Sequence, residues 1–294
     1  MSNYKTDCPN CGGNDFYVTP SNGVGYCFHC GYYERDSTSE AKVYKPKSTI
    51  ESIRNFYKIA SRYYHSCMSG SALTYLESRG ISGTLVEKFQ LGFVPEDMPQ
   101  HFDKELARDS GLYVNGKCVL ANRVSFPYLV GTVVTDIRGR SLEPHADIRY
   151  KSPLGSSELR GAVFPYNYDD HKTDHLVTEG EIKSIISSNF GVPTVGLPGI
   201  TSWRPMTSGT DVKQVIVFDS NKDRHKRESV FRAIDKLATK LYNPYVAVLP
   251  LLGRSEMDLD TFVMTVSSTQ HHDLIKNALP YSEWAKLQRR NNVY

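Results

Sequence analysis

The sequence predicts an α/β protein, α+β overall, with a small cysteine-rich module at its N-terminus. Three observations support this class. Two Cys-x-x-Cys pairs lie within the first 30 residues, helical and then β-rich segments follow over residues 50–137, and strands alternate with helices over residues 175–249. Alternation of strands and helices is typical of a parallel sheet, whereas β segments joined by a turn favour an antiparallel one. With 294 residues, the chain can bury more than one core.

Composition narrows the class of protein without identifying its partners. The formal net charge is only +3 and 39% of the residues are hydrophobic. A nucleic-acid surface would therefore have to come from local clustering of basic residues. No apolar run approaches the ~18 residues of a membrane span, and the first residues are polar. We therefore expect a cytoplasmic protein with no membrane partner.

Four cysteines form two closely spaced pairs. Fifteen residues separate the pair Cys8 and Cys11 from the pair Cys27 and Cys30, a spacing that lets four thiolates meet around one zinc ion. A redox Cys-x-x-Cys motif would instead occur singly beside a βαβ unit. The pattern predicts a zinc ribbon over residues 1–35 that holds one structural Zn²⁺.

Three helices are expected after a polar linker. Residues 36–49 are polar and without periodicity, as in a tether. Apolar residues recur at three- and four-residue steps over 50–68, which predicts an amphipathic helix packed on a core. A second helix over 72–79 ends at Gly80, and a third begins after Ser82, which is suited to cap it.

The rest of the chain predicts two kinds of sheet. Residues 123–126 and 131–137 have the pattern of strands joined by a turn. From residue 175 the pattern is that of a parallel α/β sheet, and two short helices broken at Pro280 follow from Gln270, with Ser282 as the cap of the second. The expected elements of the parallel sheet are strands at 176–178, 194–196, 214–218 and 245–249 and helices at 181–189 and 227–241.

Acidic residues lie where hydrophobic strands are expected to end. Glu179 and Asp219 follow two such runs directly, and Asp258 and Asp260 follow a further segment. Carboxylates at the ends of successive strands would converge on one edge of a sheet, where divalent metals and phosphates can be held. The sequence therefore predicts phosphoryl-transfer chemistry.

Several motifs together resemble a known family. Glu179-Gly180 followed by Asp219 is similar to the Toprim domain of primases, topoisomerases and some nucleases. With the zinc ribbon and the upstream segments, roughly residues 5–265 resemble bacterial-type (DnaG-like) primases, especially the primase half of phage primase-helicases. The chain has no GxxxxGK[ST] loop, so a phage-type stand-alone primase is expected. The upstream segments are Ala72–Gly80, Phe89–Gly92, Arg123–Pro127, Arg138–Arg140 and Arg149–Pro153.

The resemblance implies an activity, cofactors and partners. The activity is that of a DNA primase, a DNA-directed RNA polymerase that makes short RNA primers for DNA replication. Its partners would be a single-stranded DNA template, ribonucleoside triphosphates and a separate replicative helicase, in the cytoplasm of a host bacterium. Two Mg²⁺ or Mn²⁺ ions would assist nucleotidyl transfer. The implied domains are a zinc ribbon (1–35), a linker (36–49), the N-terminal part of the polymerase core (50–170), a Toprim catalytic domain (171–268) and a C-terminal helical tail (269–294).

The resemblance also assigns roles to the acidic residues. Asp219, Asp258 and Asp260 would hold Mg²⁺, and Glu179 would be either a ligand or the base that receives the hydroxyl proton. All four would therefore be catalytic residues.

Two positions depart from the family's pattern. Asn221 replaces the second acidic residue of an Asp-x-Asp pair, and Lys183 replaces an acidic residue one turn after the Glu-Gly pair. Asn221 keeps a carbonyl oxygen and so stays a candidate catalytic residue, while Asp223 is a candidate magnesium ligand that would compensate. Lys183 would instead contact a phosphate.

A group of basic residues is expected to bind the triphosphate and the template backbone. Any one of them could simply belong to a solvated charged face, and only the family-like spacing of the group favours binding. Arginines bind phosphates through paired hydrogen bonds, which suits this role. The candidates are Arg123, Arg138, Arg140, Arg149, Lys151 and Lys183.

Two other functions stay open. A Toprim nuclease or topoisomerase would normally carry a tyrosine-nucleophile or ATPase domain, and neither has a counterpart in this sequence. A non-catalytic regulator would bind nucleic acid through the zinc ribbon and keep an inactive Toprim fold because of Asn221.

Overall fold

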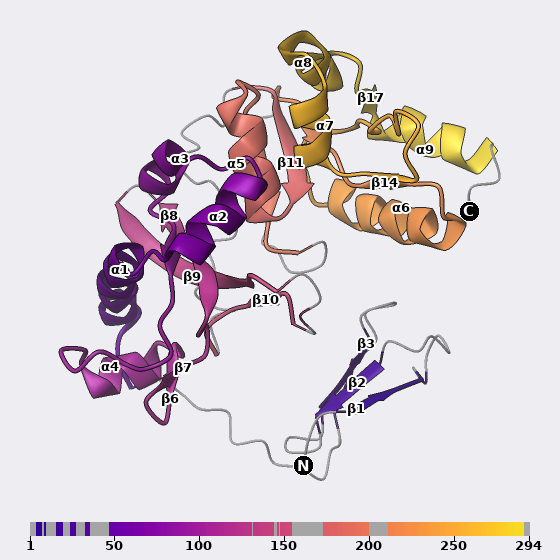
Figure 1. Cartoon of the computed structure of the whole chain (residues 1–294). Coiled ribbons are helices and arrows are strands. Elements are labelled where there is room, and N and C mark those ends of the chain that lie inside the picture. The colour runs from indigo at the N-terminus through magenta and orange to yellow at the C-terminus, as the bar shows by residue number, and fades with distance from the viewer. Residues whose placement is uncertain are drawn as a thin grey trace. The chain divides into compact units, whose positions relative to one another are not determined.

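The chain divides into two compact units, Met1–Lys45 and Pro46–Tyr294 (Figure 1). None of the helices in the described part of the chain is both long and apolar enough to cross a membrane. The computed structural model describes residues 4–7, 9, 16–19, 24–27, 33–35, 47–130, 132–143, 146, 148–154, 173–199 and 211–290.

The first unit contains an antiparallel sheet of four short strands in chain order. Phe16 is 2% exposed, and a side chain at Gly25 would lie only 2.2 Å from its ring, so the neighbouring strand needs glycine there. Strands two and three pair antiparallel, with Tyr17 opposite Tyr26. The strands are β1 (Tyr4–Thr6), β2 (Phe16–Thr19), β3 (Val24–Cys27) and β4 (Tyr33–Arg35).

The second unit opens with the three expected helices. α1 (Ile50–Ser66), α2 (Gly70–Ser78) and α3 (Gly83–Lys88) lie within a few residues of the predicted ranges. The side chains of Thr49 and Ser69 cap α1 and α2 by accepting hydrogen bonds from backbone N–H groups. Local periodicity and capping residues were therefore sufficient to locate these helices.

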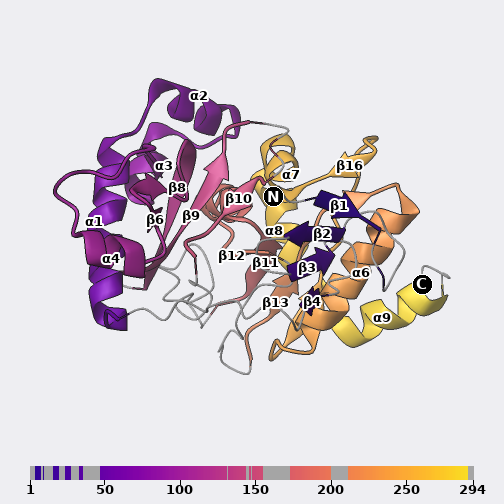
Figure 2. The same ribbon diagram turned by 90° about the horizontal axis from the view of Figure 1, so that it is seen from below.

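An antiparallel sheet packs against α1. Its strands run in the order β10-β9-β8-β5, and Figure 2 shows α1 alongside β8 and β9. The apolar face of α1 and the inner face of β9 share one hydrophobic cluster. The strands are β5 (Gly92–Phe93), β8 (Arg123–Val130), β9 (Val133–Ser141) and β10 (Tyr150–Lys151).

A short helix and a hairpin in this half were not predicted. They are α4 (Lys104–Asp109) and the pair β6 (Tyr113–Val114) and β7 (Lys117–Cys118). The hairpin turns at Asn115-Gly116, where both residues have positive φ. Asn-Gly is a strong sequence signal for a two-residue hairpin, so this turn was predictable.

The second half of the unit is built on a five-stranded sheet. The strand order is β12-β11-β13-β15-β17, parallel except for β17, which pairs antiparallel with β15. The predicted parallel sheet is therefore confirmed, although β13 and β15 are shorter than expected and β11 and β12 slightly longer. The strands are β11 (His175–Glu179), β12 (Thr194–Leu197), β13 (Gln214–Ile216), β15 (Pro244–Val246) and β17 (Leu279–Pro280).

Helices cover both faces of this sheet (Figure 1). Leu176 and Val215 pack into the cluster that contains α5 and α7. Val177 and Ile216 pack into the opposite cluster, with α6 and α9. Burial of both faces explains why these strands are continuous apolar runs. The remaining elements are α5 (Glu181–Asn189), α6 (Arg224–Ala238), α7 (Leu259–Thr265), α8 (Ser268–Lys276), α9 (Tyr281–Arg290) and the antiparallel pair β14 (Ser220–Asn221) and β16 (Glu256–Met257).

The structure corrects two expectations near the C-terminus. Helix α7 was not predicted, because the acidic pair at its start was assigned to the end of a strand. Ser282 lies inside α9 and is not its cap. The break between α8 and α9 at Pro280 is confirmed. The predicted domain boundary at 170/171 falls in residues 155–172, outside the described residues, and stays a prediction.

Candidate active site

Glu179 is the last residue of β11, at the carboxyl edge of the parallel sheet. The next residue, Gly180, has φ 94° and begins α5. Only glycine adopts this backbone conformation without strain, so it allows the sharp turn from strand to helix. Burial raises the pKa of Glu179 above its usual value; the ammonium of Lys183 opposes the shift and the charge of Asp219 adds to it.

Asp219 follows β13, the strand next to β11. Lys183, in the first turn of α5, donates a hydrogen bond from Nζ to Oδ1 of Asp219 at 2.5 Å. Burial raises the pKa of Asp219, Lys183 lowers it, and the charges of Asp258 and Asp260 raise it again. The two strand-end carboxylates and the lysine thus act on one another electrostatically.

Asp258 and Asp260 reach this region from α7, not from a strand of the main sheet. Asp258 caps the helix by accepting a hydrogen bond from the backbone N–H of Thr261 at 3.0 Å. Burial opposes its ionisation, but hydrogen bonds with Thr261 and the charge of Lys183 lower its pKa. Asp260 is 1% exposed and forms an ion pair with Arg79 from the C-terminal end of α2. Arg79 was not predicted as a site residue, because the two residues are 181 positions apart.

The donor chemistry of this cluster fits a hard divalent cation. All four acidic side chains offer oxygen atoms, which Mg²⁺ and Mn²⁺ prefer. Oδ1 of Asp260 is buried and has no hydrogen-bond partner among the described residues, so it is an unused ligand. In the arrangement seen here, no three His, Cys, Asp or Glu side chains of the described residues are grouped as metal ligands. A cation would therefore require adjustment of side chains, starting with the Lys183–Asp219 pair.

The structure holds Asn221 and Asp223 in a local network at the start of α6. Asn221 donates from Nδ2 to Oε2 of Glu256 at 2.7 Å and accepts from the backbone N–H of Asp223 at 2.8 Å. Asp223 accepts from the backbone N–H of Lys226 at 2.9 Å as the cap of α6, which lowers its pKa. Both side chains have a structural role in this arrangement, and their predicted catalytic and metal-binding roles stay predictions.

Arg138 is buried in the interior. Its Nη1 donates to Oε1 of Glu181 at 2.8 Å, and the hydroxyl of Tyr128 donates to the same oxygen at 2.5 Å. Arg138 is 11% exposed and Glu181 is fully buried. Burial opposes the charge of Arg138, but Glu181 raises its pKa above the ordinary value. This ion pair connects β9 to the first turn of α5, and sequence reasoning did not anticipate it.

Arg140 is also bonded inside the protein. It donates hydrogen bonds to the hydroxyls of Tyr75 and Tyr150. The ring of Tyr150 lies under the guanidinium groups of Arg138 and Arg140, at 4.6 and 5.0 Å from its centroid. The phosphate-binding role predicted for these two arginines stays a prediction, while the structure gives both of them internal partners.

Arg123 on β8 and Lys151 on β10 are in a different environment. Burial lowers the pKa of Arg123, and burial together with the charge of Arg123 lowers that of Lys151. Neither has an anionic partner among the described residues, and Nε of Arg123 is buried without a hydrogen-bond partner there. Arg149 is exposed. A half-buried pair of like charges is a suitable site for an anion.

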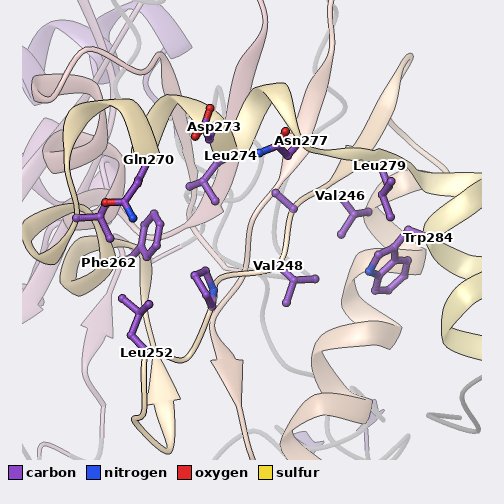
Figure 3. A pocket seen from close by; sticks show the side chains of 13 residues that line it. Val246, Val248, Leu252, Phe262, Gln270, Asp273, Leu274, Asn277, Leu279 and Trp284 are labelled. Atoms are coloured by element: carbon purple, nitrogen blue, oxygen red, sulfur yellow. The ribbon is translucent and has the colours of Figure 1, made fainter.

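Two cavities flank the segment after β15, one of them bordered by α7 and the other by α6. One, of about 430 Å³, is lined mainly by apolar side chains, with Leu252 and Phe262 at one end and Trp284 at the other (Figure 3). None of the four acidic site residues lines it. The other, of about 220 Å³, is lined by Asp219, Asn221 and mostly apolar side chains. We place the candidate site at the four carboxylates and not in the larger, apolar cavity, because the apolar side chains of that cavity cannot bind a phosphate or a metal ion.

The predicted zinc ligands fall largely outside the described residues. Cys8, Cys11 and Cys30 lie outside them, and for Cys27 only the backbone in β3 is described, paired with Phe16. The zinc site therefore stays a prediction.

The curated relatives that the chain matches are all named DNA primase. No protein-family model matches the chain. An alignment of 275 positions, which covers 82% of the chain, is 24% identical to the DNA primase of Haemophilus influenzae, of which it covers 45%. The chain spans about half the length or less of the curated relatives it matches.

Solved structures share the fold. The DnaG catalytic core matches with a TM-score of 0.60 at 18% identity, covering 78% of this chain and 80% of that chain. The Aquifex aeolicus primase, comprising its zinc-binding and RNA polymerase domains, matches with a TM-score of 0.60 at 18% identity, covering 99% and 82%. The chain thus has the mixed α+β fold of the DnaG catalytic core, and the resemblance to bacterial-type primases is confirmed.

Proposed function

We propose that the chain is a DNA primase, which joins ribonucleotides on a single-stranded DNA template. The observation that carries the proposal is the group of acidic residues at the carboxyl edge of the parallel sheet, within the fold of the DnaG catalytic core. The similarity to proteins named DNA primase over most of the chain supports the same activity. In the proposed domain plan, residues 1–35 are a zinc ribbon and 171–268 a Toprim domain.

The acidic residues would perform the chemistry. Asp219 and Asp258, with Glu179 and the unused oxygen of Asp260, would hold a divalent ion, which when bound neutralises charge on the departing pyrophosphate. Glu179 is suited to receive a proton from the attacking 3′-hydroxyl, because its raised pKa brings a carboxylate closer to the pH at which a base works well. Arg79 holds Asp260 in place through their ion pair.

Arg123 and Lys151 would bind the anionic substrates. Burial disfavours both charges, the charge of Arg123 further disfavours that of Lys151, and a phosphate would relieve both effects. Gly139, on the neighbouring strand, supports this arrangement, since a side chain there would lie 3.0 Å from Cδ of Arg123. One solved neighbour is the DnaG primase catalytic domain bound to ssDNA, which favours single-stranded DNA as the template here.

The direct test is synthesis. Purified protein is incubated with mixed single-stranded DNA templates, labelled ribonucleotides and Mg²⁺ or Mn²⁺, and the products are resolved on a denaturing gel. Short, template-dependent oligoribonucleotides are expected. Replacement of Cys27 should remove zinc and the choice of template sequence before it affects the second unit, because the chain divides at residues 45/46. No product with either metal would reject the proposal.

A second candidate is a non-catalytic nucleic-acid-binding protein. The observation that favours it is the ion pair between Lys183 and Asp219, which provides an internal cation for the acidic cluster. Under this alternative, the chain would bind single strands in the assay above, make no oligoribonucleotides, and bind equally well with and without Mg²⁺.

A further inference from the structure

The smaller of the two cavities adjoins the candidate site and has apolar walls. Its volume is about 220 Å³, and Asp219, which follows β13 at the acidic edge of the parallel sheet, is one of its lining residues. Phe231 and Ile234 line it from α6, and Val248 and Leu251 line it from the segment after β15. A molecule bound at the acidic edge can therefore extend directly into an apolar cavity.

The size and the walls of the cavity limit what it can hold. Pockets for drug-sized molecules measure roughly 300–1,000 Å³, so this cavity suits a smaller group, such as a single heterocyclic base. The ring of Phe231 packs edge-on against Trp284, with the ring centroids 5.3 Å apart, which fixes its position. Unstacked bases bind to aromatic side chains of this kind. Val248 is 58% exposed, so the cavity is open to solvent and a base inside it can still pair with a template.

The cavity also contains two polar side chains suited to a nucleotide. The guanidinium of Arg227 donates from Nη1 to the backbone carbonyls of Lys222 at 2.5 Å and of Asn221 at 3.5 Å. Both carbonyls follow closely after Asp219 in the chain, so this cation lies on the side of the cavity next to the acidic edge. The half-buried amide of Gln288, on α9, forms no hydrogen bond with the described residues. An amide offers both donors and an acceptor, as the edge of a base does.

We propose that this cavity is the subsite for the base of the ribonucleoside triphosphate that binds at the acidic edge. The inference rests on the proposed function and deepens it, because it names the part of the substrate that the cavity holds. Phe231 and Val248 pack on the base, and Gln288 forms hydrogen bonds with its edge. The cation of Arg227 attracts the phosphates. These contacts need no template, so they are measurable in a complex of the chain with the nucleotide alone.

The experiment compares nucleotides with the phosphate chain alone. Binding of ATP, GTP, CTP and UTP, and of inorganic triphosphate, to the full chain is measured by isothermal titration calorimetry in Mg²⁺ without template. Val248→Trp fills the cavity from an exposed position, and Gln288→Leu removes the amide. The matched controls are Ile59→Trp, at an exposed position of α1, and Lys286→Leu, at an exposed position of α9. Circular dichroism and thermal unfolding check that each variant folds.

Val248→Trp should weaken binding of the nucleotides by roughly tenfold or more and leave the affinity for inorganic triphosphate unchanged, because only the base loses its space. Gln288→Leu should weaken nucleotide binding by roughly three- to tenfold, and it keeps the test valid if the tryptophan prevents folding. Both controls should match the wild type. Equal affinity of the wild type for the nucleotides and for inorganic triphosphate, or unchanged nucleotide affinity in both cavity variants, would overturn the inference.

Primer synthesis by the same variants separates this inference from the proposed function. Val248→Trp should raise the KM for ribonucleotides and change kcat little. Synthesis by Val248→Trp with the KM of the wild type would reject the inference and leave the function standing. Nucleotide binding that depends on the cavity, without any primer synthesis, would support the inference about the cavity and reject the function.

Discussion

The two sheets of the second unit place charged residues in opposite environments. On the antiparallel sheet, Arg138 and Arg140 are buried and bonded to Glu181 and to tyrosine hydroxyls. At the edge of the parallel sheet, Glu179 and Asp219 lie near other acidic groups, and both have a raised pKa. Opposite charges in contact stabilise the fold, whereas like charges held together are stabilised by a ligand. The surroundings of a charged side chain therefore distinguish a structural from a functional role better than its residue type does.

The largest expected effect is on activity, and it tests whether the acidic residues at the edge of the parallel sheet are functional. Asp219→Asn should lower primer synthesis by roughly 10³-fold or more, because the negative charge of a metal ligand is lost. The melting temperature should change little, since relief of repulsion within the acidic site offsets the loss of the ion pair with Lys183. The measurements are the gel assay and thermal unfolding. The matched control is Asp97→Asn, an exposed aspartate that forms a surface ion pair with Lys117, which should leave synthesis unchanged. Full synthesis by Asp219→Asn would contradict the assignment.

Replacing a buried arginine of the antiparallel sheet should instead reduce stability. Arg138→Ala leaves the carboxylate of Glu181 buried without its cation and should cost roughly 3–5 kcal/mol of unfolding free energy. The free energy of unfolding is measured by urea denaturation, followed through the helical circular dichroism signal of the second unit. The double variant Arg138→Met with Glu181→Leu should recover much of the loss, since no charge is then left unpaired. A cost for Arg138→Ala below about 1 kcal/mol would mean that the pair is solvated in solution.

Arg123 and Lys151 should behave in the opposite way. Replacing either by alanine should weaken binding of single-stranded DNA or nucleoside triphosphate by roughly tenfold and reduce the salt dependence by about one counterion. Stability should stay the same or rise, because repulsion between the two cations is removed. Fluorescence anisotropy at several salt concentrations measures this. Lys236→Ala, an exposed change on α6, is the control, and an equal loss in that variant would show a non-specific charge effect.

The smallest effect is a pH dependence. The folded chain binds protons at Glu179 and Asp219 more tightly than the unfolded chain, because both pKa values are raised above 4.5 and 3.8. The stabilisation linked to these protons is present below the ordinary values and is lost as pH rises through the raised ones. We therefore expect the urea midpoint of the wild type to fall relative to that of Glu179→Gln as the pH rises above the ordinary carboxyl pKa of 4.5. A midpoint difference independent of pH would contradict the raised pKa.

Local signals allowed much of the fold to be predicted, and long-range pairing limited the rest. The strand-to-helix bend at Glu179-Gly180 and the helix at residues 50–66 follow from patterns within a few residues. The pairings Arg79–Asp260 and Arg138–Glu181 join residues 181 and 43 positions apart, which no local pattern contains. Two basic residues assigned to substrate binding are therefore internal in the structure. Burial, which decides the role of a charge, depends on the tertiary fold.

The hydrophobic cluster beneath the site has a consequence for cooperativity. Val124 and Phe126 of β8 belong to the same cluster as Leu176 of β11 and Ile185 of α5. The two sheets therefore share buried surface, and neither half can open without exposing the apolar face of the other. We therefore expect β8 and β11 to open as one cooperative unit. The slowest-exchanging amide hydrogens of the two strands should then have the same free energy of opening. Residues 171–294 expressed alone would expose that face and aggregate.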